Sequence, residues 1–101
     1  MLLELRDLQK NTERYLGQEV ILNGWAKKIR SQKNFGFIEL NDGTFFIGIQ
    51  VVFDETLPNF EEISKLTISS SIKVKGKVVE SQGQGQDYEI HATRIDIYDK
   101  A

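Results

Sequence analysis

The stretch that decides the fold of this chain reads NGWAKKIRSQKN (residues 23–34), FGFIELNDGT (35–44) and FFIGIQVV (45–52). Its three parts alternate apolar with polar residues, which is typical of β-strands, and Asp42-Gly43 is a strong hairpin-turn signal. The first turn carries a run of cations with no acid in it, namely Lys27, Lys28, Arg30 and Lys33. We therefore expect three antiparallel strands, and we hypothesise that their outer face binds a single-stranded nucleic acid.

The remaining residues extend this pattern to a five-stranded barrel. A long first strand with a bend or bulge at Gly24 can serve two sheet edges, which is how a small barrel closes. We expect strands over residues 18–29, 35–41, 45–52, 71–81 and 88–98, short helical turns over 2–16 that end at Gly17, and a helix over about 60–66. The order of three strands, a helix and two strands is that of the OB-fold, a Greek-key barrel.

We therefore predict an all-β fold with short helices in a single domain over residues 1–101. Residues 1–17 would be an N-terminal helical extension and residues 18–98 the barrel. An all-antiparallel barrel with a different connection is the alternative fold. Within the barrel we expect a clean apolar face on the third strand, a capping box from Asn59 to Glu62 at the helix start, and a bulge near Thr93-Arg94.

Composition excludes several classes of protein. The chain has 101 residues, 40% of them hydrophobic, no cysteine and a formal net charge of −2. One small core is possible without disulfides, and the absence of cysteine is compatible with a cytoplasmic location, which we expect. No apolar run has the length of a membrane span, so we expect no membrane partner. The net charge is mildly unfavourable for nucleic-acid binding, but the distribution of cations matters more than their sum.

The residue types needed for catalysis or for metal binding are largely missing. His91 is the only histidine, and the sequence places no serine or carboxylate beside it, so we interpret it as a surface residue. No set of ligands has metal-coordinating spacing. Helix capping explains the paired Glu61 and Glu62, and the glycine-rich residues 82–87 lack a phosphate-binding motif. We therefore expect no catalytic residue, no metal and no cofactor in this chain.

Four polar or aromatic residues on non-core faces suit base recognition. Phe37 can stack on a base, although it can also pack under the loop that precedes it. Gln50 offers a donor and an acceptor, which matches the Watson–Crick edge of uracil. Glu89 offers only acceptors, which suits the adjacent N–H groups of guanine, and Arg30 can bind a base carbonyl or a phosphate. Each of these side chains taken singly is more often merely solvated.

These residues also resemble a known family, the N-terminal anticodon-binding barrels of class IIb aminoacyl-tRNA synthetases. The matching segments are GQEV (17–20), GW (24–25), Arg30, GFIEL (36–40), DG (42–43) and IQV (49–51). Further segments are similar to the bacterial asparaginyl enzymes, namely TLPNF (56–60), GKVVES (76–81), GQGQ (83–86) and YEIHA (88–92). The aspartyl enzymes carry a run of arginines where this chain has Lys27-Lys28-Ile29-Arg30, which argues against that identity.

The resemblance implies specific roles for these residues. Phe37 would stack on the central anticodon uridine, Gln50 would read it with help from Arg30, and Glu89 would read the first anticodon base. The third base would be read near the loop between the last two strands. Weaker RNA contacts are expected from Lys27, Lys28, Lys33, Ser81, Gln82 and Gln84.

The resemblance also implies what this chain lacks. The class II catalytic motifs have no counterpart in 101 residues, so ATP and Mg would bind only to a catalytic domain linked to this one. We expect an isolated domain or a stand-alone relative that is monomeric and binds a tRNA anticodon loop with the sequence GUU. The alternatives are a barrel that binds single strands with little sequence preference, or a protein-interaction barrel.

Overall fold

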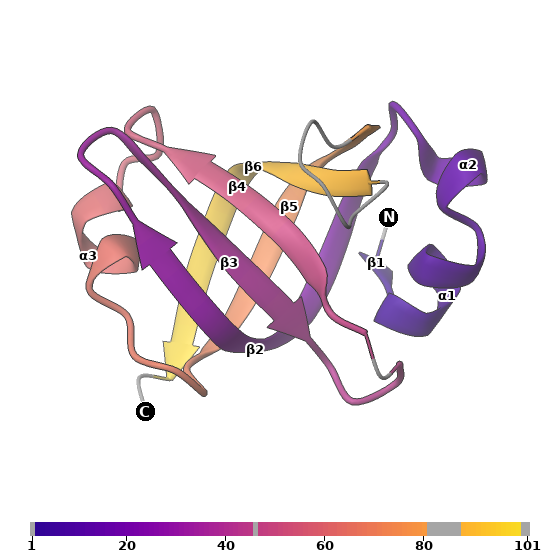
Figure 1. Cartoon of the computed structure of the whole chain (residues 1–101), viewed down its shortest axis with the longest axis horizontal. Coiled ribbons are helices and arrows are strands. Elements are labelled where there is room, and N and C mark those ends of the chain that lie inside the picture. Colours follow the sequence, from indigo (N-terminus) through magenta and orange to yellow (C-terminus); the bar gives the residue numbers. More distant parts are fainter. Residues whose placement is uncertain (1, 46, 81–87, 100–101) are drawn as a thin grey trace.

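A computed structural model describes residues 2–45, 47–80 and 88–99 of the chain. Its strands form one sheet in the order β1-β2-β3-β4-β6-β5, and an additional pairing of β2 with β5 closes the sheet into a barrel (Figure 1). The elements are β1 (Leu2–Leu3), α1 (Leu5–Lys10), α2 (Thr12–Tyr15), β2 (Glu19–Ser31), β3 (Phe35–Asn41), β4 (Ile49–Asp54), α3 (Phe60–Ser64), β5 (Ser71–Glu80) and β6 (Tyr88–Asp99). The predicted five-stranded OB-fold barrel is therefore confirmed, with β2 to β6 as its strands.

Strand β2 closes the barrel because it pairs on both of its edges. Its first half, Glu19 to Trp25, pairs antiparallel with β5, and its second half, Trp25 to Ser31, pairs antiparallel with β3. At Gly24 a Cβ atom would lie 2.3 Å from the carbonyl oxygen of Asn41, so only glycine fits this close approach. The bend or bulge predicted at Gly24 is not a bulge; the register shifts instead between Ala26 and Lys28 and leaves Lys27 unpaired in the ladder.

The core is one cluster of apolar side chains inside the barrel. Alternate residues of the strands fill it as the pattern predicted, and the fully buried members include Val20, Leu22, Ile38, Val51, Val74 and Ile90. Helices α1 and α2 lie at one end of the barrel and α3 lies at the other (Figure 1). Their buried residues Leu5, Leu8 and Ile63 close these two ends.

The connection between β3 and β4 is longer than predicted. Leu40 pairs with Ile49, so the third barrel strand starts at Ile49 and not at Phe45, and Ile47 is 53% exposed. Polar side chains in the connection accept hydrogen bonds from its backbone N–H groups. Asn41 Oδ1 accepts from the Gly43 N–H, and Asp42 Oδ1 accepts from the Thr44 N–H. These local bonds replace the ladder bonds of a tight hairpin, so the expected apolar face of the third strand begins only at Ile49.

The same connection holds the N-terminal helix against the barrel. Asp42 Oδ2 accepts from the Leu5 N–H at 2.8 Å, and Thr44 Oγ1 accepts from the Arg6 N–H at 2.9 Å. The first turn of α1 thus receives its capping groups from a loop that is distant in sequence. A further short strand, β1, pairs in parallel with β2 and was not predicted.

Of two local features predicted for the second half of the chain, the structure confirms one, the bulge near Thr93, and not the other, the capping box at Asn59. The bulge predicted near Thr93 is confirmed, because Lys75 pairs with Arg94 and Gly76 with Ala92. The capping box predicted at Asn59 is wrong. Its side-chain amide instead donates to the carbonyl oxygen of Ile95 at 2.8 Å, which ties the start of α3 to β6, and the helix ends at Ser64.

The carboxylate of Asp42 gives the fold a testable dependence on pH. Burial opposes its charged form, but hydrogen bonds from the Leu5 N–H and from Thr44 outweigh that effect and lower the pKa of Asp42. A lowered folded-state pKa means that the stabilisation is present above the unfolded pKa of about 3.9 and is lost as the pH falls through the folded value.

We expect Asp42→Asn to lower the free energy of unfolding by roughly 1 kcal/mol at pH 7, because the charged acceptor for α1 is lost. The difference from the wild type should shrink as the pH falls from about 4 through the lowered folded-state pKa of Asp42. Urea unfolding at several pH values measures both effects. Asp99→Asn, at an exposed carboxylate, is the control. If the difference in free energy of unfolding between Asp42→Asn and the wild type stayed constant with pH, this role of Asp42 would be contradicted.

Candidate nucleic-acid interface

Two rows of side chains run across the outer face of β2, β3, β4 and β6. Directly paired residues on neighbouring strands lie on the same face of a sheet, about 4.5–5.5 Å apart. The first row is Lys28, Glu39, Gln50 and Glu89, and the second is Arg30, Phe37, Val52 and His91. All four principal residues predicted from the sequence, Arg30, Phe37, Gln50 and Glu89, lie in these two adjacent rows.

The bulge in β2 brings two of the cations to this face. Strict alternation from the buried Ala26 would turn Lys28 and Arg30 toward the core. Because Lys27 is the extra residue of the bulge, the phase changes there, and both Lys28 and Arg30 are exposed. Lys28 then pairs with Glu39 and Arg30 with Phe37 in the ladder.

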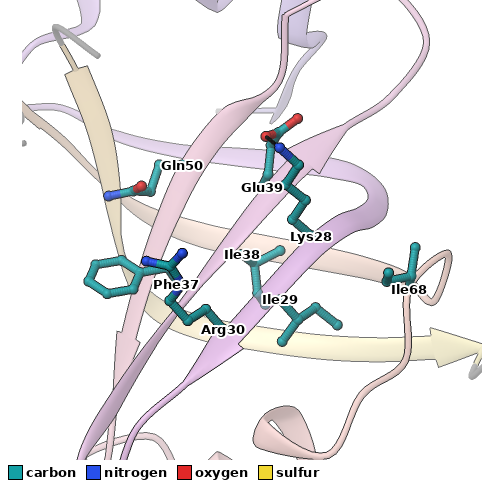
Figure 2. A pocket seen from close by; sticks show the side chains of 8 residues that line it. All are labelled: Lys28, Ile29, Arg30, Phe37, Ile38, Glu39, Gln50 and Ile68. Carbon is teal, nitrogen blue, oxygen red and sulfur yellow. Dashed lines mark ion pairs between the residues drawn. The ribbon is translucent and has the colours of Figure 1, made fainter. Parts of the chain in front are cut away.

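A cavity of about 510 Å³ opens on this face and is lined by Lys28, Ile29, Arg30, Phe37, Ile38, Glu39, Gln50 and Ile68. Figure 2 shows Phe37, Arg30 and Gln50 gathered at one end of it. The cavity therefore joins an aromatic ring, a guanidinium group and an amide on three neighbouring strands.

Phe37 lies at the surface of the barrel and outside the described core cluster. It is half-buried, and its ring makes an edge-to-face contact with Phe35 at 5.5 Å between centroids. Phe35 itself is 37% exposed, so the contact extends an aromatic surface toward solvent. Sequence reasoning assigned no role to Phe35, although its position two residues before Phe37 on one strand was the available signal.

Gln50, Glu89 and His91 form a chain of hydrogen bonds. Gln50 Nε2 donates to Glu89 Oε1 at 3.3 Å, and Glu89 Oε2 lies 2.7 Å from His91 Nε2. The predicted surface position of His91 is confirmed, but its carboxylate neighbour Glu89 was not predicted. The missed signal is again a separation of two residues on one strand, which places both side chains on one face.

This chain of bonds fixes the polar groups that a ligand would meet. Glu89 is 8% exposed, and both of its oxygens have a protein partner. Gln50 uses one N–H on Glu89, which leaves a second N–H and its carbonyl oxygen available. The carboxylate thus orients the amide of Gln50, and the pair presents an ordered set of donors and acceptors.

The cation run has a neighbouring acid that sequence reasoning did not detect. Glu39, from β3, lies 3.8 Å from Lys27 Nζ and 4.0 Å from Lys28 Nζ. Strand register, not sequence distance, brings these groups together. Lys33 is exposed in the β2–β3 loop, and the predicted residues Ser81, Gln82 and Gln84 lie outside the described residues.

Other kinds of site find little support in residues 2–45, 47–80 and 88–99. No group of three or more His, Asp or Glu side chains there could hold a metal ion. A second hollow lies between the β2–β3 loop and α3, and its lining mixes three acids with two lysines: Glu55, Glu61, Glu62, Lys33 and Lys65. None of the described helices is long and apolar enough to cross a membrane.

Comparisons with known proteins agree with this geometry. A family model described as an OB-fold nucleic acid binding domain, tRNA anti-codon, matches residues 20–98. The chain is 52% identical over 93 residues to asparagine–tRNA ligase of Bacillus anthracis, covering 92% of this chain and 20% of that protein. It is 48% identical over 97 residues to the corresponding ligase of Clostridium novyi, covering 96% of this chain and 21% of that protein.

A solved structure shows the same fold. Asparaginyl-tRNA synthetase from Pyrococcus horikoshii superposes with a TM-score of 0.77 over 87% of this chain and 21% of that chain, at 23% identity. This likeness supports the barrel topology alone, because the identity is low. The chain spans about one fifth of the length of the curated relatives that it matches.

The position of Phe37 outside the core predicts a modest effect on stability. We expect Phe37→Ala to lower the free energy of unfolding by about 1 kcal/mol, through loss of the contact with Phe35. Phe53→Ala is the matched comparison, since Phe53 is 1% exposed on the adjacent strand β4 and its truncation should cost about 3–5 kcal/mol. Thermal or urea unfolding separates the two variants; equal losses would make Phe37 a core residue.

Proposed function

This chain belongs to the family of OB-fold nucleic acid binding domains of the tRNA anti-codon type, and from that premise we propose that it binds the anticodon loop of tRNA-Asn. In this proposal it is the N-terminal domain of an asparagine–tRNA ligase, which charges tRNA-Asn with asparagine at the expense of ATP. High identity to such ligases over nearly the whole chain supports this assignment.

The observation that carries the proposal is the convergence of Phe37, Gln50 and Arg30 in one cavity. A base stacked on an aromatic side chain gains about 1–3 kcal/mol, and Phe37 has the half-exposed ring that stacking requires. The free N–H and carbonyl of Gln50 then match the carbonyl and N–H of uracil. Arg30, paired with Phe37 across β2 and β3, supplies charge for a carbonyl or phosphate oxygen.

Glu89 extends the proposed recognition to the first anticodon base. Guanine presents two adjacent N–H groups, and an ionised carboxylate offers about four lone-pair sites on its two oxygens. Glu89 can therefore accept both N–H groups while it keeps Gln50 and His91 as partners. These contacts favour an anticodon that begins with guanine and has a central uridine, as GUU does.

Catalysis in this proposal lies elsewhere in the ligase. The chain covers about one fifth of the length of its relatives. ATP and Mg would accordingly bind to the part of the ligase that this chain does not include. The contribution of this domain is to select the tRNA, and we propose that it is monomeric when isolated.

A titration with anticodon stem-loops tests the proposal. The chain should bind the stem-loop with anticodon GUU and lose affinity when the central U becomes C, since C exchanges the donor and acceptor that Gln50 meets. Phe37→Ala should weaken binding by about 1–3 kcal/mol through loss of stacking. Fluorescence anisotropy at fixed salt measures both effects.

The same titration distinguishes the alternatives. Equal binding of the U and C stem-loops would instead indicate a barrel with little sequence preference. The absence of any salt-sensitive RNA binding would favour a protein-interaction barrel.

The amide of Gln50 provides a second, independent test. Gln50→Glu replaces its N–H groups with acceptors and places a second carboxylate beside Glu89. Uridine should therefore lose its advantage over cytidine, and overall affinity should fall because two negative charges then face the RNA. Gln50→Met has a side chain of similar length and no charge, so it is the control for the added carboxylate. An unaltered U/C preference in Gln50→Glu would remove Gln50 from the recognition site.

A further inference from the structure

The cavity has a second end that the contacts proposed above leave empty. Phe37, Arg30 and Gln50 lie at one end, whereas Ile68 lies at the other, with Ile29 and Ile38 between them (Figure 2). A single base stacked on Phe37 and paired with Gln50 would occupy only the first end. The second end is bounded by Ile68, Ile29 and the Lys28–Glu39 ion pair.

Ile68 is held at this place by a constrained turn. It is 62% exposed although it is a large apolar residue, and the next residue, Ser69, has a φ of 77°. That left-handed conformation is unfavourable for a residue other than glycine, so the surrounding structure must impose it. Two backbone bonds do so, because the Ser69 N–H donates to the Ala26 carbonyl at 2.7 Å and the Ala26 N–H donates to the Ser70 carbonyl at 2.9 Å.

These bonds tie the turn to the same part of β2 that carries the bulge. Ser70 is fully buried, so the turn is anchored in the core while Ile68 projects outward. The backbone that carries Ile68 is therefore anchored at the rim of the cavity.

The side chains at this end suit the face and the edge of a base. Glu39 lies within 4.0 Å of the amino groups of both Lys27 and Lys28, so its carboxylate partly offsets these two cations. Ile68 offers exposed apolar surface, which suits the face of a nucleobase and not a charged group. The Lys28–Glu39 pair still offers one donor and one acceptor to the edge of a base.

We propose that the second end of the cavity holds another unpaired nucleobase of the same RNA strand, packed on Ile68. This subsite rests on the proposed binding of an anticodon loop, and it adds a position that neither Phe37 nor Gln50 reaches. Its apolar wall selects for an unpaired, accessible base, because a base in a duplex has both faces covered.

Abasic substitution in the RNA tests the subsite directly. Stem-loops with the anticodon GUU and an abasic nucleotide at each loop position in turn are titrated against the wild-type chain and Ile68→Ala. The wild type should bind more weakly when the abasic nucleotide is at the central anticodon position. It should also bind about three- to tenfold more weakly when the abasic nucleotide replaces the one base that packs on Ile68. In Ile68→Ala the intact stem-loop should bind about three- to tenfold more weakly, and the abasic nucleotide at that one position should cause no further loss.

Two further variants keep the result interpretable. Ile47→Ala is the matched control, because Ile47 is 53% exposed but lies in the β3–β4 loop and does not line the cavity, and its binding should equal that of the wild type. Ile68→Phe enlarges the apolar wall and should tighten binding of the intact stem-loop, a gain that misfolding cannot produce.

The possible outcomes separate the two proposals. If Ile68→Ala binds every stem-loop as the wild type does, or loses the same factor at all abasic positions, the second subsite is wrong while anticodon binding stands. If the wild type binds no stem-loop, the proposed function fails and the subsite fails with it.

Discussion

The double pairing of β2 is the constraint on which the rest of the structure depends. The sheet closes because β2 gives its first half to β5 and its second half to β3. The change of partner occurs at Gly24 and Trp25, where Gly24 admits the backbone of Asn41. The bulge at Lys27 follows directly, and it turns Lys28 and Arg30 outward. Closure of the barrel and assembly of the interface thus depend on two neighbouring irregularities of β2.

The interface also contributes to the register of the parallel pair β4 and β6. Glu89 is nearly buried, and a buried carboxylate is costly unless its oxygens are hydrogen-bonded. Its bonds to Gln50 and His91 satisfy both oxygens only when Gln50 lies opposite Glu89. A shift of one residue would move Gln50 to the other face of its strand and leave the carboxylate short of a donor. The polar groups proposed for base recognition therefore also disfavour incorrect strand pairing.

The sequence predicted what depends on local pattern and missed what depends on register. Alternation identified the five barrel strands, and the shift of apolar phase located the bulge at Thr93, because both signals lie within one segment. The pairing of Glu39 with Lys27 and Lys28 depends instead on how β3 aligns with the bulged β2. The true start of β4 was missed for a similar reason. Phe45 and Ile47 fit the alternation, but the side chains of Asn41 and Asp42 bind the backbone of the turn, and Thr44 binds α1.

The distribution of charge indicates how such an interface separates affinity from selectivity. Non-specific binding to nucleic acid grows with the number of phosphates that cations neutralise. On a single strand, each neutralised phosphate adds about 0.7 to the steepness with which log K falls as log[salt] rises. In the basic segment, the one carboxylate of Glu39 pairs with both Lys27 and Lys28, whereas Arg30 and Lys33 form no ion pair within the part of the chain that the structure describes. Few unopposed cations leave little affinity for an arbitrary strand. In the proposed complex, most of the binding energy would come from stacking and from matched hydrogen bonds at Phe37, Gln50 and Glu89, and these depend on which bases are present. A net charge of −2, unfavourable for affinity alone, is consistent with the selective binding proposed for this domain.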